Sequence, residues 1–181
     1  MALPRLRTLV AKASRQVEDH FRVLGLPHKF DINSKELKQT YLEQMELCHP
    51  DKFACKSEQE RANAEEQSAN ITHAFKIISH PQTRAVHLLD LLGKPLEEDK
   101  DFNLLAPDFL MEVMETREEL EAAPSAERMR EMREENAQRI EGLVSDLSTS
   151  FGVHRLDEAR LLTAKLRYAQ RVEDEIRDRI D

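Results

Sequence analysis

Apolar residues recur every three or four positions in the first half of the chain, the spacing that places them on one face of an α-helix. The pattern predicts a short helix at about residues 17–24, which Gly25 and Pro27 end. A second helix is predicted to begin after Asn33, because this residue and Glu36 have the spacing of an N-terminal cap. The apolar stripe of the second helix consists of Leu37, Tyr41, Met45 and Cys48.

The second helix is predicted to end at Cys48, because Pro50 fixes its own φ and disfavours the helical conformation in His49. Ser57 starts another capping pattern, and a third helix then extends to about residue 79. The loop between these helices is short, so we expect an antiparallel hairpin with the first helix laid across it. The stripe of the third helix consists of Ala64, Ser68, Ile71, Phe75 and Ile78.

A fourth helix is predicted from Pro81, a residue that the first helical turn tolerates. Its leucines lie on more than one side, so we expect it to pack between two subdomains. A linker follows, and three more helices are predicted at about residues 107–123, 125–151 and 156–180. Helices joined by short turns pack as an up-down-up bundle, so the second half is predicted to be a three-helix bundle.

The composition supports an all-α protein. Only four Gly, seven Pro and two Tyr occur in 181 residues, and these numbers leave few places for a sheet. The net charge of −8 opposes a general nucleic-acid binder, because such proteins neutralise phosphates with a concentrated basic surface. No apolar run is long enough to cross a bilayer. We therefore expect protein partners, with no nucleic acid and no membrane.

The N-terminal residues 1–17 contain no acid, and their basic residues are Arg5, Arg7, Lys12 and Arg15. This composition is typical of an organellar transit sequence or its remnant. A basic, amphipathic helical extension explains the same residues, and both interpretations stay open.

The segment from Cys48 to Phe53 is the most unusual local feature of the chain. Its proline makes a stiff loop, on which Asp51 can accept hydrogen bonds from an Arg or from backbone donors of a partner. An ordinary hairpin turn, in which Asp51 caps the third helix, is the alternative. A metal site of Cys48, His49, Asp51 and Cys55 is disfavoured, because no Cys-x-x-Cys pair exists. The two cysteines form no disulfide framework, which indicates a reducing compartment.

With His49-Pro50-Asp51 between two antiparallel helices, the sequence resembles the J-domain co-chaperones. It looks in particular like the HscB-type J-proteins of iron–sulfur cluster biogenesis, with a collinear match from about Phe21 to Val172. Besides the loop, the matching segments are Gln67-Ser68-Ala69-Asn70-Ile71, His80-Pro81, Arg84-Ala85, Leu88-Leu89, Phe109-Leu110-Met111-Glu112 and Arg117-Glu118-Glu119-Leu120-Glu121.

This resemblance implies an adaptor and not an enzyme. Such a protein binds the iron–sulfur cluster scaffold protein, delivers it to a specialised DnaK-type chaperone and stimulates the chaperone's ATP hydrolysis to promote cluster transfer. No cofactor is implied, because the chain lacks the cysteine pairs of the zinc module that some eukaryotic members carry. The implied location is the mitochondrial matrix, with the bacterial cytoplasm as the alternative. The predicted chaperone-binding residues are His49, Pro50, Asp51, Lys52 and Lys38.

The helix from Pro107 shows a physical sign of a second interface. Phe109, Val113, Thr116 and Leu120 form one face of it, while Leu110, Met111 and Met114 fall on another. The extra apolar residues need either an exposed partner site or ordinary packing against a second helix of the bundle. The resemblance assigns scaffold binding to Leu110, Met111, Met114, Glu115, Glu118 and Tyr168.

The predicted organisation is an L-shaped, all-α protein. It divides into a basic extension (1–16), a J-domain with its connecting helix (17–93), a linker (94–105) and a scaffold-binding bundle (106–181). The J-domain's second helix departs from the family pattern, in which it is strongly basic, since Lys35 and Lys38 are offset by glutamates. Electrostatic attraction of the chaperone to this helix should therefore be weak. A J-domain co-chaperone whose bundle binds another client or mediates dimerisation is the alternative function.

Overall fold

The computed structural model describes residues 18–48, 50–53, 56–97, 105–122 and 125–180. Within these ranges the chain forms α-helices and one short 3-10 helix, with no strand, so the predicted all-α fold is confirmed. The elements are α1 (His20–Val23), α2 (Ser34–Cys48), η1 (Pro50–Phe53), α3 (Glu58–Ser79), α4 (Pro81–Leu91), α6 (Pro107–Glu121), α7 (Ala126–Gly152) and α8 (Leu156–Ile180).

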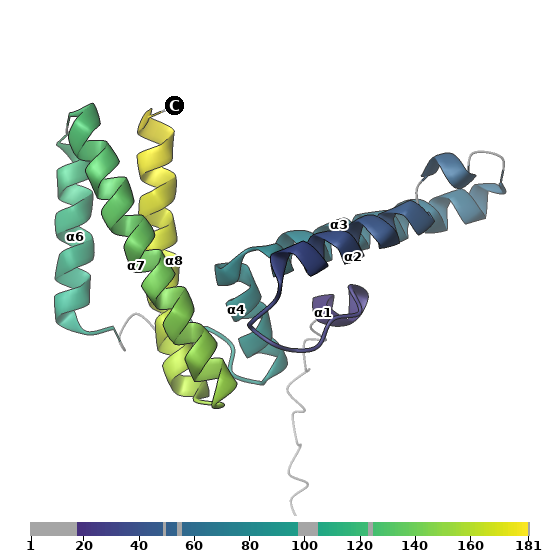
Figure 1. Ribbon diagram of the computed structural model, residues 1–181, viewed down its shortest axis with the longest axis horizontal. Coiled ribbons are helices and arrows are strands. Elements are labelled where there is room, and N and C mark those ends of the chain that lie inside the picture. Colours follow the sequence, from purple (N-terminus) through teal and green to yellow (C-terminus); the bar gives the residue numbers. More distant parts are fainter. Residues whose placement is uncertain (1–17, 49, 54–55, 98–104, 123–124, 181) are drawn as a thin grey trace, which may run out of the picture.

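The helices build two arms that meet at a corner (Figure 1). One arm is the antiparallel pair of α2 and α3, with α1 packed against α3. The other arm contains α6, α7 and α8 side by side. The corner is occupied by α4, which contacts both α3 and α8. The predicted L-shaped combination of a hairpin and a three-helix bundle is therefore confirmed.

Local sequence signals determine where the helices begin and end. At the start of α3 the backbone N–H of Glu60 donates to the Ser57 hydroxyl at 3.3 Å, and that of Ser57 donates to the Glu60 carboxylate at 3.0 Å. This reciprocal capping box satisfies two N–H groups that a helix leaves without partners. Gly25, after α1, has a φ of +67°, which glycine adopts without strain. The predicted helix ends at these places are confirmed.

The two arms share an apolar core. Buried residues of α1 to α4, such as Phe21, Ile78 and Leu89, pack in the same cluster as Leu147 of α7 and Leu166 of α8. The burial of all these side chains removes apolar surface from water and stabilises both arms together. A second, smaller cluster within the bundle consists of Leu120, Met132, Val172 and Ile176. None of the described helices is long and apolar enough to span a membrane.

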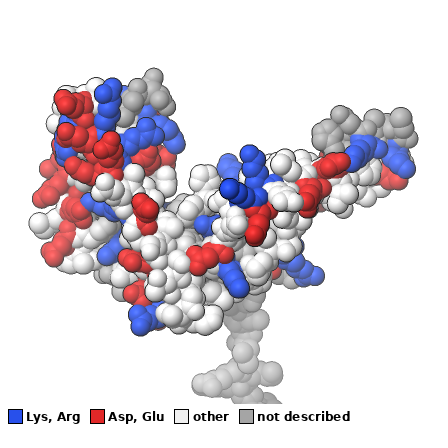
Figure 2. Space-filling model, in the orientation of Figure 1, with Lys and Arg blue, Asp and Glu red and all other residues white. Residues whose placement is uncertain are grey.

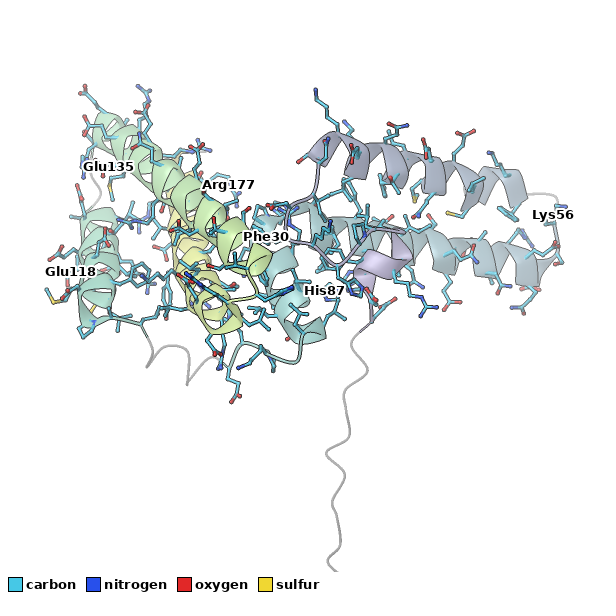
Figure 3. The ribbon with its side chains drawn as sticks, turned by 60° about the horizontal axis from the view of Figure 1, so that its bottom comes forward. Phe30, Lys56, His87, Glu118, Glu135 and Arg177 are labelled. Carbon is cyan, nitrogen blue, oxygen red and sulfur yellow. The ribbon has the colours of Figure 1, made fainter. Side chains whose placement is uncertain are left out.

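A layered contact joins the arms at the corner. The Phe30 ring stacks on the Phe151 ring of α7 at 5.2 Å, and the buried Arg84 guanidinium of α4 lies 5.0 Å from the centre of the Phe30 ring. Beside this layer the Ser148 hydroxyl donates to the Asp31 carboxylate at 2.7 Å. Figure 3 shows Phe30 where the two arms meet. The prediction that the fourth helix packs between two subdomains is thus confirmed.

Three histidines meet where α1, α3 and α4 pack together. The buried rings of His20 and His87 lie 4.6 Å apart, and the exposed His73 meets His20 edge to face at 5.0 Å. The backbone N–H of His20 donates to Nε2 of His87 at 3.1 Å, so this nitrogen carries no proton. Burial lowers the pKa of His20 and lowers the pKa of His87 to about 4. The fold therefore keeps both buried rings neutral near pH 7.

Acidification is expected to destabilise the fold through His20 and His87. Above their ordinary pKa of 6.5 both groups are neutral in the folded and unfolded chain, and their contribution to stability is complete. As the pH falls from 6.5 towards 4, the unfolded chain binds protons that the folded chain excludes, so the free energy of unfolding decreases. At about pH 5.5 the loss from His87 alone should be about 1 kcal/mol, measured by urea unfolding.

A His87→Phe variant is the control for this pH dependence, because it removes the titrating ring and keeps its apolar surface. Its free energy of unfolding should fall less between about pH 7.5 and 5.5. Asp19 does not titrate in this interval, because hydrogen bonds from Arg22 and His28 outweigh burial and hold the pKa of its carboxyl below 3.8. An equal loss in His87→Phe and the original chain would contradict the prediction.

Candidate functional site

The loop between α2 and α3 lies at the far end of the hairpin arm (Figure 1). The helix α2 ends at Cys48, as predicted, and Pro50 and Asp51 belong to η1, where only their backbone is described. His49 lies outside the described residues. Figure 3 shows Lys56, shortly after η1, at the tip of this arm. The position of the loop is therefore confirmed, and the binding roles of its residues stay a prediction.

The solvent side of α2 presents a shallow hollow and two exposed leucines. Leu42, which borders the hollow, exposes 55% of its surface, and Leu47, near the loop, exposes 75%. Neither leucine is among the predicted site residues, although the helical period places both outside the apolar stripe of this helix. The exposed Lys38 belongs to the same hollow, whose lining residues are Lys35, Lys38, Gln39, Leu42, Glu43 and Glu46.

Lys52, another predicted chaperone-binding residue, is exposed on η1 and forms an ion pair with Glu46 of α2 at 3.5 Å. An exposed ion pair contributes little to stability, but it offsets the positive charge of Lys52. This pairing agrees with the prediction that electrostatic attraction towards α2 is weak.

The alternative interpretation of the loop, a metal site, includes two residues that lie outside the described part of the chain. Cys48 is buried, and its thiol donates to the backbone oxygen of Gln44 at 3.2 Å, while His49 and Cys55 lie outside the described residues. Among the described residues, no group of three or more His, Cys, Asp or Glu side chains is arranged to hold a metal ion.

The bundle helix α6 is held on two flanks by ion pairs and on a third side by its core residues. Val113 and Leu120 are buried, as predicted for the core face. Towards α7, Glu112 pairs with Arg139, and Glu119 pairs with Arg128 at 2.6 Å. Towards α8, Arg117 pairs with Glu175 at 3.3 Å.

The fourth side of α6 is left to solvent. Met111 and Met114 expose 58% and 61% of their surface, and Glu115 and Glu118 are exposed beside them. Leu110 is half-buried. Ordinary bundle packing therefore does not account for the two methionines, because the flank towards α7 is occupied by Glu112 and Glu119. In Figure 3, Glu118 points outward from α6, away from the other two helices.

Tyr168 joins this face from the neighbouring helix. It is half-buried on α8, and its ring meets the Phe109 ring edge to face at 6.2 Å. Phe109, predicted for the core, is itself only half-buried and forms the border of the exposed face. The structure thus groups five of the predicted scaffold-binding residues on α6 and brings the sixth, Tyr168, to their edge.

The charged residues 127–135 at the start of α7 form more than local ion pairs. Arg128 does pair with Glu131 and Glu135 of its own helix, but it also binds both carboxylate oxygens of Glu119, at 2.6 and 3.2 Å. This contact holds α6 to α7, and the sequence spacing alone contains no signal for it.

The hairpin of α2 and α3 has a proline-containing loop at its tip and a short helix, α1, packed on one side. This arrangement defines the class of J-domain proteins. Residues 19–87, which include α1 to α3 and most of α4, match the family model of the DnaJ domain. Residues 105–177, which include α6, α7 and most of α8, match the model described as the HSCB C-terminal oligomerisation domain. The chain is therefore a J-domain co-chaperone, and not an enzyme.

The chain belongs to the HscB family of iron–sulfur cluster co-chaperones. It is 35% identical to a co-chaperone protein HscB homolog of Acinetobacter baumannii over 158 residues, 87% of this chain and 88% of the relative. It is 28% identical to the human iron–sulfur cluster co-chaperone protein HscB over 174 residues, 96% of this chain and 73% of the human protein. Relatives therefore occur both in a bacterium and in human.

Solved structures agree with this assignment. The crystal structure of human co-chaperone protein HscB superposes with a TM-score of 0.82 at 27% identity, covering 90% of this chain and 82% of the human one. Chaperone HscB from Vibrio cholerae gives a TM-score of 0.76 at 27% identity, covering 88% of this chain and 96% of the other. Membership of the family implies a DnaK-type chaperone and a cluster scaffold protein as partners.

Proposed function

We propose that the chain binds the scaffold protein with the exposed face of α6 and the adjoining flank of α8, and delivers it to the chaperone. The loop at the tip of the other arm then contacts the chaperone and stimulates its ATP hydrolysis, which promotes transfer of the cluster to a recipient protein. The observation that carries this proposal is the exposure of Met111 and Met114 on a helix whose other sides are occupied.

The scaffold-binding face combines apolar and acidic groups, a mixture that suits a specific protein interface. Methionine side chains are flexible and polarisable, so they adapt to a partner surface. The proposed contacts are Leu110, Met111, Met114, Glu115, Glu118 and Tyr168.

On the hairpin arm, His49, Pro50 and Asp51 are proposed to bind the chaperone, supported by Lys38 and Lys52. The proline restricts the loop, so little conformational entropy is lost when it binds. To stimulate hydrolysis, these residues must bind the hydrolysis-competent state of the chaperone more tightly than its other state. Because α2 carries only two cations, Lys35 and Lys38, beside several glutamates, apolar contacts at Leu42 and Leu47 support the docking, which favours a specialised chaperone partner.

Single-turnover ATP hydrolysis by the chaperone tests the proposed function at both interfaces. The full chain alone should accelerate hydrolysis, and the scaffold protein added with it should accelerate hydrolysis further, because it brings a chaperone substrate to the same complex. The scaffold without this chain should have a much smaller effect. A chain that binds scaffold but leaves the hydrolysis rate unchanged would contradict the proposal.

For location, we propose the mitochondrial matrix, supported by the absence of acids and the presence of Arg5, Arg7, Lys12 and Arg15 in residues 1–17. Isolated, energised mitochondria should take up the chain and protect it from added protease. Replacing Arg5 and Arg7 by Glu should abolish this protection, and replacing exposed Arg155 and Arg177 by Glu should not. A chain that stays accessible to protease favours the bacterial alternative.

A further inference from the structure

Two cations of α8 lie against the aromatic rings at the border of the scaffold-binding face. Nζ of Lys165 is 5.3 Å from the centre of the Phe109 ring, and the guanidinium carbon of Arg171 is 5.7 Å from the centre of the Tyr168 ring. Lys165, Tyr168 and Arg171 follow one another at intervals of three residues, so they form a continuous row on the surface of α8. We call Lys165 and Arg171 the cationic edge.

The cationic edge differs from five arginines of the bundle. Within the part of the chain that the structure describes, neither Lys165 nor Arg171 forms an ion pair with a carboxylate, and both lie on aromatic rings instead. A ring face attracts a cation without neutralising its charge. These charges therefore stay available to a partner. By contrast, carboxylates bind Arg117, Arg128, Arg133, Arg139 and Arg177.

The scaffold-binding face consequently has opposite charges on its two sides. Glu115 and Glu118 are exposed on α6, and the cationic edge lies on α8. Leu110 and Met114 lie between them, because the helical period puts both on the side of α6 where Arg117 reaches α8. Figure 2 shows acidic side chains gathered over the bundle arm, with Lys and Arg side chains among them.

We propose that Lys165 and Arg171 bind carboxylates of the scaffold protein and thereby determine its orientation on the apolar centre of the face. This inference rests on the proposed function and specifies the partner surface. That surface combines apolar side chains with acids towards α8 and with Lys or Arg towards α6. A scaffold rotated by half a turn would place acids against Glu115 and Glu118, and this repulsion excludes the wrong orientation.

Charge reversal of the exposed Arg171 tests the inference in the full-length chain. Arg171→Glu should weaken scaffold binding by about 10-fold at low ionic strength, and the difference should shrink as salt is added. Arg171→Lys should bind nearly as the original chain does. Lys165→Met, which keeps the aliphatic stem over the Phe109 ring, should weaken binding by a smaller factor.

Arg155→Glu is the matched control, because Arg155 is an exposed arginine that precedes α8 and pairs with Glu158 of its first turn. It changes the net charge equally and should leave scaffold affinity unchanged. Circular dichroism and the thermal unfolding midpoint verify that each variant is folded. If Arg171→Glu binds scaffold with the affinity of the original chain, the inference is overturned and the proposed function stands. Failure of the original chain to bind scaffold would overturn the proposed function and this inference together.

Discussion

Asp51→Asn is expected to abolish stimulation of the chaperone's ATP hydrolysis while leaving the fold intact. The substitution keeps the size of the side chain and removes the charge that strengthens hydrogen bonds to an Arg or to backbone donors of the partner. The loop lies at the tip of the hairpin, beyond the shared core of the two arms, so the thermal unfolding midpoint should not change appreciably. Single-turnover hydrolysis, with the rate extrapolated to saturating chain, measures the effect.

Glu58→Gln is the matched control for Asp51→Asn. Glu58 is an exposed acid in the first turn of α3, so this variant loses the same charge close to the loop. It should keep its stimulation of hydrolysis, and both variants should bind scaffold as the original chain does. Normal stimulation by Asp51→Asn would reject the proposed role of the loop and would leave Asp51 as a helix cap.

Replacing Leu110, Met114 and Tyr168 by Ala in one variant is expected to weaken scaffold binding by more than about 100-fold. The three side chains provide the apolar centre of the face, and a few buried anchors carry most of the free energy of a protein interface. Without scaffold, the variant should stimulate hydrolysis as the original chain does, because the loop is at the end of the other arm. Titration calorimetry with the scaffold protein measures the first effect.

Val153→Ala is the control for this triple replacement, since Val153 is 57% exposed and follows directly after α7, outside the proposed contacts. Scaffold affinity should be unchanged in it. Single replacements of Leu110 or Met114 by Ala distinguish a local loss of contacts with the scaffold from damage to the fold of the bundle. A joint loss of scaffold binding and of scaffold-free stimulation would mean that the fold is damaged and would contradict the assignment of these residues.

The helices could be predicted because their signals are local. Ser57 and Glu60 form the capping box that their spacing predicts, and α2 ends at Cys48, the predicted position two residues before Pro50. Whether Met111 and Met114 are exposed could not be decided in this way, because a bundle helix contacts two neighbours and a broad apolar arc fits either packing or binding.

Contacts between residues distant in sequence decide that question. Glu112 and Glu119 face α7 through Arg139 and Arg128, and they leave the methionines no packing partner there. The cationic edge is hidden for the same reason, since the alignment of Lys165 with the Phe109 ring depends on how α6 lies on α8. The predicted boundaries at residues 93–94 and 105–106 remain a prediction.

The shared core has a consequence for any attempt to separate the two halves of the molecule. Leu147, Phe151, Ala159 and Leu166 of the bundle cover apolar side chains of the hairpin half. Cutting the chain after α4 would leave that surface uncovered on both fragments, which would then tend to aggregate or to reassociate. The two halves should unfold in a single thermal transition. A chimera that carries the bundle of a relative should fold only where the residues corresponding to Phe30 and Phe151 still pack against each other.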